Sequence, residues 1–94
     1  SMQISKAIQA YCAHRRARYS QGRETVADML QVMDRKATGE EIWLELSQRG
    51  YRISESAVYV HLRWLTDNGF AQKCKGQGRM AEYFLTRSGS APLK

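Results

Sequence analysis

The sequence predicts one small α+β domain that is mostly helical. Its length of 94 residues suits a single domain. Apolar residues recur at helical spacing in successive segments up to Asp67, whereas from Phe70 onward the residues alternate as they do in strands. Glycine stop signals at Gly50 and Gly69 close two of the helical segments. We therefore expect helices first and a β-hairpin last.

The first helix is predicted from Met2 to about Tyr19, and the second from about Arg23 to Asp34. Each contains apolar residues three and four positions apart, which places them on one side of a helix. These stripes are Ile4, Ile8, Tyr11 and Cys12 in the first helix, and Val26, Met29, Leu30 and Met33 in the second. Ser20-Gln21-Gly22 predicts a break between them, with Gly22 in a left-handed conformation.

The third and fourth helices are predicted to begin at residues that cap helix N-termini. Thr38 and Glu41 have the spacing of a capping box, and Ser54 caps the fourth helix. The buried sides are expected to contain Ile42, Trp43 and Leu46 in the third helix, with Leu44 as a further candidate, and Ala57, Val58, Leu62 and Leu65 in the fourth. The stretch 50–53 between them has the length of the turn in a helix-turn-helix.

A β-hairpin is predicted after the fourth helix, with strands at 70–75 and 80–86 and a turn at Gly76-Gln77-Gly78. A three-helix core followed by a two-stranded wing is a winged helix-turn-helix, here with an extra N-terminal helix. The expected organisation is residues 2–22 as N-terminal helix and basic segment, 23–87 as the winged helix-turn-helix domain, and 88–94 as a flexible tail.

Composition and motifs narrow the function. Lys and Arg number 15 against 9 Asp and Glu, and the net charge of +6 suits a polyanionic partner. Cys12 and Cys74 lack further ligands at metal spacing, so we expect reduced thiols, no metal and no cofactor. The sequence contains no phosphate-binding loop or catalytic signature, which argues against an enzyme. The absence of a membrane span or signal-peptide pattern leads us to expect a cytoplasmic protein.

The fourth helix and the wing carry the residues that we expect to contact nucleic acid. An exposed polar helix face can read bases in the major groove, and basic residues beside a glycine-rich turn suit a phosphate backbone. The candidates are Ser54, Glu55, Ser56, Tyr59, His61 and Arg63 in the helix, Lys73, Lys75 and Arg79 in the wing, and Arg15, Arg16 and Arg18 in the basic segment. The alternatives are that Tyr59 belongs to a packing seam and that the cations only solubilise the surface.

One series of residues points to a known family. The series comprises Glu41–Leu46, Gly50, Ile53–Tyr59, Leu62, Leu65 and Gly69-Phe70. It resembles the DNA-binding half of ferric uptake regulator (Fur) proteins over about residues 23–86. The resemblance implies a winged-helix fold and places Ser54 and Tyr59 at DNA-contacting positions. The chain departs from that pattern at Ala57 and Val60, where the family has Thr and Arg, and it stops before the family's metal-sensing dimerisation domain, so iron sensing is not expected.

Two functions fit these observations. The first is sequence-specific binding of double-stranded DNA by a small transcriptional regulator, with the helix from Ser54 in the major groove and residues 73–79 on the phosphate backbone. The alternative is a winged-helix module for protein–protein interaction. A homodimer would form through the apolar stripe of the N-terminal helix, unless that stripe packs on the second helix of its own chain.

Overall fold

The computed structural model describes residues 4–15, 21–76, 78 and 80–86. Within these residues the chain forms four helices and three strands. Their order is α1 (Ile4–Arg15), α2 (Gln21–Met33), β1 (Ala37–Thr38), α3 (Gly39–Gln48), α4 (Glu55–Asp67), β2 (Ala71–Lys75) and β3 (Ala81–Leu85). The predicted winged helix-turn-helix with an N-terminal helix is confirmed, while the predicted tail at 88–94 lies outside the described residues.

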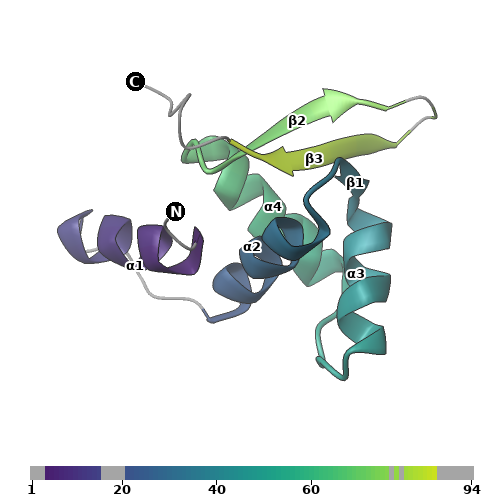
Figure 1. Ribbon diagram of the computed structural model, residues 1–94, viewed down its shortest axis with the longest axis horizontal. Helices are drawn as coiled ribbons and strands as arrows, with labels where there is room; N and C mark the ends of the chain where they lie inside the picture. Colours follow the sequence, from purple (N-terminus) through teal and green to yellow (C-terminus); the bar gives the residue numbers. More distant parts are fainter. Residues whose placement is uncertain (1–3, 16–20, 77, 79, 87–94) are drawn as a thin grey trace.

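The helices are arranged around α2, which contacts α1, α3 and α4. Figure 1 shows α1 on one side of α2 and α3 on the other, with the β2–β3 hairpin lying over one end of the helices. The end of β2 and the start of β3 lie over α3 (Figure 1). The hairpin is therefore a wing in its geometry as well as in its sequence pattern.

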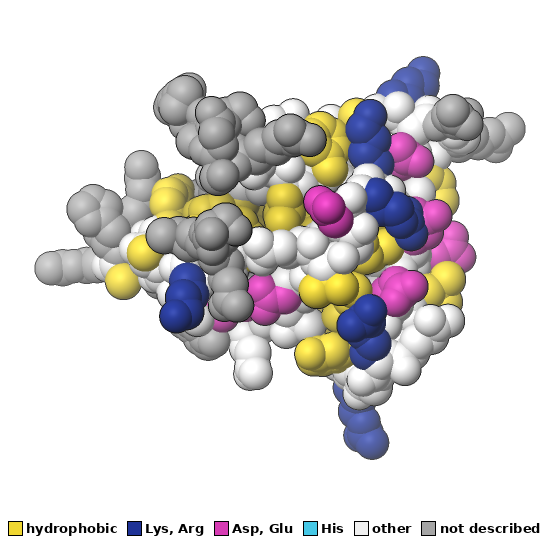
Figure 2. All heavy atoms as spheres, viewed as in Figure 1, with side chains coloured by type: hydrophobic (Ala, Val, Ile, Leu, Met, Phe, Trp, Pro, Cys, Tyr) yellow, Lys and Arg dark blue, Asp and Glu magenta, His cyan; other side chains and the backbone are white. Residues whose placement is uncertain are grey.

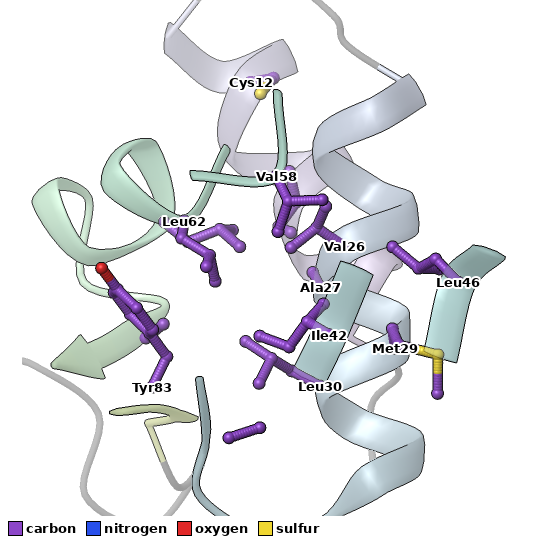
Figure 3. Close-up of a cluster of buried hydrophobic side chains, with 14 residues drawn as sticks. Cys12, Val26, Ala27, Met29, Leu30, Ile42, Leu46, Val58, Leu62 and Tyr83 are labelled. Atoms are coloured by element: carbon purple, nitrogen blue, oxygen red, sulfur yellow. The ribbon is translucent and has the colours of Figure 1, made fainter. Parts of the chain in front are cut away.

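One hydrophobic core joins the helices to the sheet. Figure 3 shows Val26 and Leu30 of α2, Ile42 of α3 and Leu62 of α4 directed toward a common centre. Tyr83 of β3 closes this cluster on the sheet side (Figure 3). Burial of the apolar stripes predicted from periodicity accounts for the packing of α2, α3 and α4. Leu44 of α3 is the exception, because it lies on the outer side of the helix and is 43% exposed.

Local hydrogen bonds fix the ends of α3 and α4, as predicted. The Thr38 hydroxyl accepts from the Glu41 N–H at 3.1 Å, and the Glu41 carboxylate accepts from the Thr38 N–H at 3.0 Å. Gly50 and Gly69 take positive φ angles of 92° and 84° directly after the helix C-caps. Residues after these glycines donate back to the last turn, so both helices end in a Schellman motif.

The wing is part of a three-stranded antiparallel sheet in the order β1-β3-β2. The two-residue strand β1 was not predicted, because it is defined only by pairing of Ala37 with Tyr83 and of Thr38 with Glu82. In the hairpin, Ala71 pairs with Leu85 and Lys75 with Ala81. The added strand attaches the start of α3 to the base of the wing.

The start of α2 differs from the prediction. Gly22 lies inside the first turn of α2 and is not in a left-handed conformation. Instead, a Cβ at Gly22 would clash with the imidazole of His61 on α4. This glycine therefore permits a close approach between two helices. The sequence signal was interpreted as a helix break because the contact joins residues far apart in the chain.

Helix α1 packs on its own chain. Ile8 and Cys12 are only 1% and 5% exposed and belong to the same core as the α2 stripe. The backbone N–H of Ile4 donates to Gln31 of α2, and Gln9 donates to Glu24, which is itself buried. The stripe that would have formed a homodimer is thus covered within one chain, which is the second of the two alternatives.

Candidate nucleic-acid interface

Helix α4 exposes one stripe of side chains opposite its buried face. Val58, Leu62 and Leu65 are buried, and the residues about half a turn away from them face outward. The outward stripe consists of Ser56, Val60, Arg63 and Asp67. Arg63 and Asp67 form an ion pair at 3.9 Å with side-chain exposures of 85% and 67%, so the guanidinium exchanges partners at little cost.

The N-terminus of α4 carries two serine hydroxyl groups close together. The Ser54 hydroxyl accepts a hydrogen bond from the Ala57 N–H at 3.1 Å and lies 3.3 Å from the Ser56 hydroxyl. Both serines are exposed, whereas Glu55 is half-buried. Helix N-termini with exposed hydroxyls and backbone N–H groups accept anions readily. Glu55 adds a carboxylate at the same helix end.

Tyr59 lies on the flank of α4 rather than on its outward stripe. Its half-buried ring covers Gly39 at the start of α3, where an added Cβ would clash with the ring. Burial raises the pKa of Tyr59, and the nearby charges of Glu55 and Glu40 act in the same direction. The phenol is therefore protonated at neutral pH and joins α4 to α3, so the packing alternative describes its ring.

His61 lies on the opposite flank of α4, against α2. Its ring covers Gly22 and is half-buried. Burial lowers the pKa of His61, and the positive charge of Arg23 lowers it further. The imidazole is thus neutral at pH 7. His61 and Tyr59, although close in sequence, do not share a face.

The wing lysines lie on the helix-facing side of the hairpin. Lys73 is directly opposite Tyr83, and alternate residues of a strand share a face, so Lys73 and Lys75 follow the buried Ala71 outward from the core. Both are exposed. On the other face, the ammonium group of Lys36 lies 5.7 Å from the ring centre of Phe84. The side chains of Lys73 and Lys75 therefore lie on the same side of the sheet as α4.

The sequence analysis missed a cluster of side chains that joins α1, α2 and α4 to Phe70, the residue before β2. The guanidinium of Arg23 lies 3.8 Å from the centre of the Trp64 ring, and Trp64 stacks on Phe70. Tyr11 packs edge-on against both aromatic rings and donates to the Asn68 side chain at 2.7 Å. The helical spacing of Tyr11 and Trp64 was the only sequence signal for this cluster. Trp64 and Arg23 therefore serve packing in this fold.

Several predicted contact residues lie outside the described part of the chain. They are Arg16, Arg18 and Arg79, together with the side chain of Arg15, whose backbone belongs to α1. Over the hairpin and α3, Figure 2 shows Lys and Arg interspersed with Asp and Glu rather than a patch of one sign. Helix α4 itself contains two acids and one arginine. A nucleic-acid interface here would depend on the wing for much of its positive charge.

The described residues form neither a metal site nor a membrane-spanning helix. No group of three His, Cys, Asp or Glu side chains in them lies close enough to hold a metal ion. None of the helices formed by these residues is long and apolar enough to cross a membrane.

Comparison with protein families decides the classification. Residues 24–89 match the family described as the ribonuclease R winged-helix domain. This chain belongs to the ribonuclease R winged-helix domain family. The matched segment omits α1 and includes α3, α4 and the wing. No curated protein matches the sequence significantly.

Solved structures give the same fold. The PerR protein of Streptococcus pyogenes, described as acting in peroxide sensing and gene regulation, has a TM-score of 0.77 at 16% identity over 89% of this chain. The ferric uptake regulators of Vibrio cholerae and Helicobacter pylori both have TM-scores of 0.74, at 19% and 21% identity over 84% and 97% of this chain. The chain spans only 58–61% of these three proteins. At such identities the predicted resemblance to Fur proteins is confirmed for the fold.

Proposed function

We propose that this winged-helix domain binds double-stranded DNA as a non-catalytic module of a transcriptional regulator. In this proposal α4 enters the major groove, and the wing at residues 73–79 lies on the phosphate backbone. The supporting observation is the exposed stripe of α4 on the same side of the sheet as Lys73 and Lys75. The major groove of B-form DNA is wide enough to admit a helix in this way.

The proposed contacts divide into two roles. On α4, Ser56 and Arg63 meet base edges, while Ser54 and Glu55 act at the helix N-terminus. Lys73 and Lys75 neutralise phosphates, and we assign the same role to Arg79 and to the basic segment at residues 15–18. Tyr59 acts indirectly, because its ring sets the position of α4 against α3. His61 is left out of this interface, since it is neutral and faces α2.

The name of the family suggests RNA as an alternative ligand. Ribonuclease R is by name an enzyme that acts on RNA, and this chain shares its winged-helix domain family. A-form RNA has a deep, narrow major groove that side chains cannot read. A reading helix such as α4 therefore favours duplex DNA over duplex RNA. Preference between matched duplexes is accordingly the measurement that separates the two nucleic acids.

A protein partner is the second candidate function. The observation that favours it is the exposed apolar side chain of Val60 on the outward stripe of α4. A homodimer through α1 is not proposed, because Ile8 and Cys12 are already buried against α2. For a protein-binding module, we expect weak binding to both DNA and RNA, with little dependence on salt concentration.

The experiment measures binding to fluorescent DNA and RNA duplexes of matched sequence over a range of salt concentrations. We expect tighter binding to DNA and a log–log slope of about −4 to −5, since roughly four to six phosphates are neutralised at about −0.9 each. Lys75→Ala should reduce the slope by about one unit, and Lys6→Ala on α1 is the matched control. A slope near zero would favour the protein partner, and preference for RNA would contradict the proposal.

A further inference from the structure

The outward stripe of α4 contains an apolar side chain at its centre. Val60 is 65% exposed and lies between Ser56 and Arg63 on the stripe opposite the buried face. Its neighbours on the stripe are polar, so Val60 does not extend the core. An exposed valine on a helix that enters the major groove can contact only an apolar group of the DNA bases.

We propose that Val60 is a specificity-determining residue that contacts the 5-methyl group of a thymine. This inference rests on the proposed function and deepens it. Valine can neither donate nor accept a hydrogen bond, so it cannot recognise the polar atoms of base edges. The thymine methyl is the apolar group that a base presents in the major groove. Contact with it discriminates against cytosine, and against uracil in RNA.

The spacing along α4 predicts which base lies next to this thymine. Val60 and Arg63 are separated by about 4.5 Å along the helix axis, from a rise of about 1.5 Å per residue. Successive base pairs are about 3.4 Å apart, so the two side chains reach neighbouring base pairs. Arginine prefers the O6 and N7 atoms of guanine. The expected binding site therefore contains a thymine within one or two steps of a guanine.

Exposure alone would also fit a protein contact, but the surroundings favour DNA. Among the described residues, the other large exposed hydrophobic side chains lie on different elements: Val32 on α2, Leu44 on α3, Tyr51 in the α3–α4 turn and Met80 before β3. A protein-binding surface usually presents a continuous apolar patch of several hundred Å². Beside Val60, in contrast, the stripe offers a hydroxyl and an ion pair that exchanges readily.

The test begins with selection of a binding sequence from random DNA duplexes. Each thymine of the selected site is then replaced singly by deoxyuridine, which removes only the methyl group. The wild type should lose about fourfold in affinity at one position, as expected for one buried methyl group. Val60→Ala should bind the thymine and deoxyuridine sites equally well. Val32→Ala, which alters a valine that is 61% exposed on α2, should retain the wild-type difference.

The outcomes separate this inference from the proposed function. If the wild type selects a DNA sequence but tolerates every deoxyuridine, the role of Val60 is wrong and DNA binding stands. The role is also wrong if Val60→Ala keeps the thymine preference, or if it alters self-association and leaves DNA affinity unchanged. If no duplex DNA is preferred over duplex RNA, the proposed function itself fails. Circular dichroism of each variant confirms that the fold is retained.

Discussion

Tyr59 and Gly39 lie so close together that a side chain at position 39 would force the Tyr59 ring to shift. The Tyr59 ring covers Gly39 so closely that an added Cβ would clash with it. Gly39 lies in the first turn of α3 and has no positive φ, so its backbone suits alanine. The glycine is therefore required by the space that the ring fills, and not by backbone conformation.

We expect Gly39→Ala to destabilise the wild type by about 1–3 kcal/mol, the usual cost of overpacking. In a Tyr59→Ala background the same substitution should be neutral or stabilising by up to about 1 kcal/mol, because alanine favours a helix over glycine. Urea denaturation of the four proteins in this cycle measures the coupling. Equal effects in both backgrounds would show that the ring does not limit the space at Gly39.

The lowered pKa of His61 predicts a pH dependence of stability. Because the folded state holds the pKa below its ordinary value of 6.5, the unfolded chain binds more protons at mildly acidic pH. The contribution of His61 is thus present above pH 6.5 and is lost as the pH falls toward the folded pKa. Urea midpoints at pH 7.5 and pH 5.5 should differ less for His61→Gln than for the wild type. An identical pH dependence would contradict the assignment.

Helix α1 is joined to the rest of the molecule by buried contacts, so its docking can be measured chemically. Ile8→Ala should cost about 2–5 kcal/mol, as for other large-to-small core substitutions. Cys12 is buried beside Arg23, whereas Cys74 is half-exposed. In a Cys74→Ser background, a thiol reagent should label Cys12 slowly in the wild type and faster in Ile8→Ala. Rapid labelling of Cys12 in the folded wild type would show that α1 opens without unfolding of the core.

The ends of α3 and α4 were predictable, and the contacts between elements were not. Thr38, Glu41 and Ser54 act on backbone groups within three residues, so their spacing suffices to place the starts of α3 and α4. Gly22 was misinterpreted because its role depends on His61, far along the chain. The same reason explains why the bond from Tyr11 to Asn68, 57 residues apart, could not be foreseen. Of the candidate site, the wing lysines and the outward position of Arg63 follow from periodicity, but the contact of the Tyr59 ring with Gly39 of α3 does not.

At the scale of the whole molecule, α1 shares its core with the winged-helix segment. Ile8 and Cys12 belong to the same cluster as Val26 and Leu30. The chain should therefore unfold in one cooperative step, although the family match begins only at residue 24. In calorimetry, the calorimetric and van't Hoff enthalpies should agree. Two resolved transitions would show that α1 and the winged helix are separate units.

The fluorescence of the two tryptophans reports on different contacts between the helices. The Trp43 indole N–H donates to the Ile53 carbonyl at 3.0 Å, in the turn that leads into α4. Trp64 lies beneath the Arg23 guanidinium at the junction with α1. Fluorescence of a Trp43→Phe protein therefore isolates the α1 joint, and that of a Trp64→Phe protein isolates the turn before α4. The chain thus contains two intrinsic optical probes, one for release of its N-terminal helix and one for movement of the helix that we place in the DNA groove.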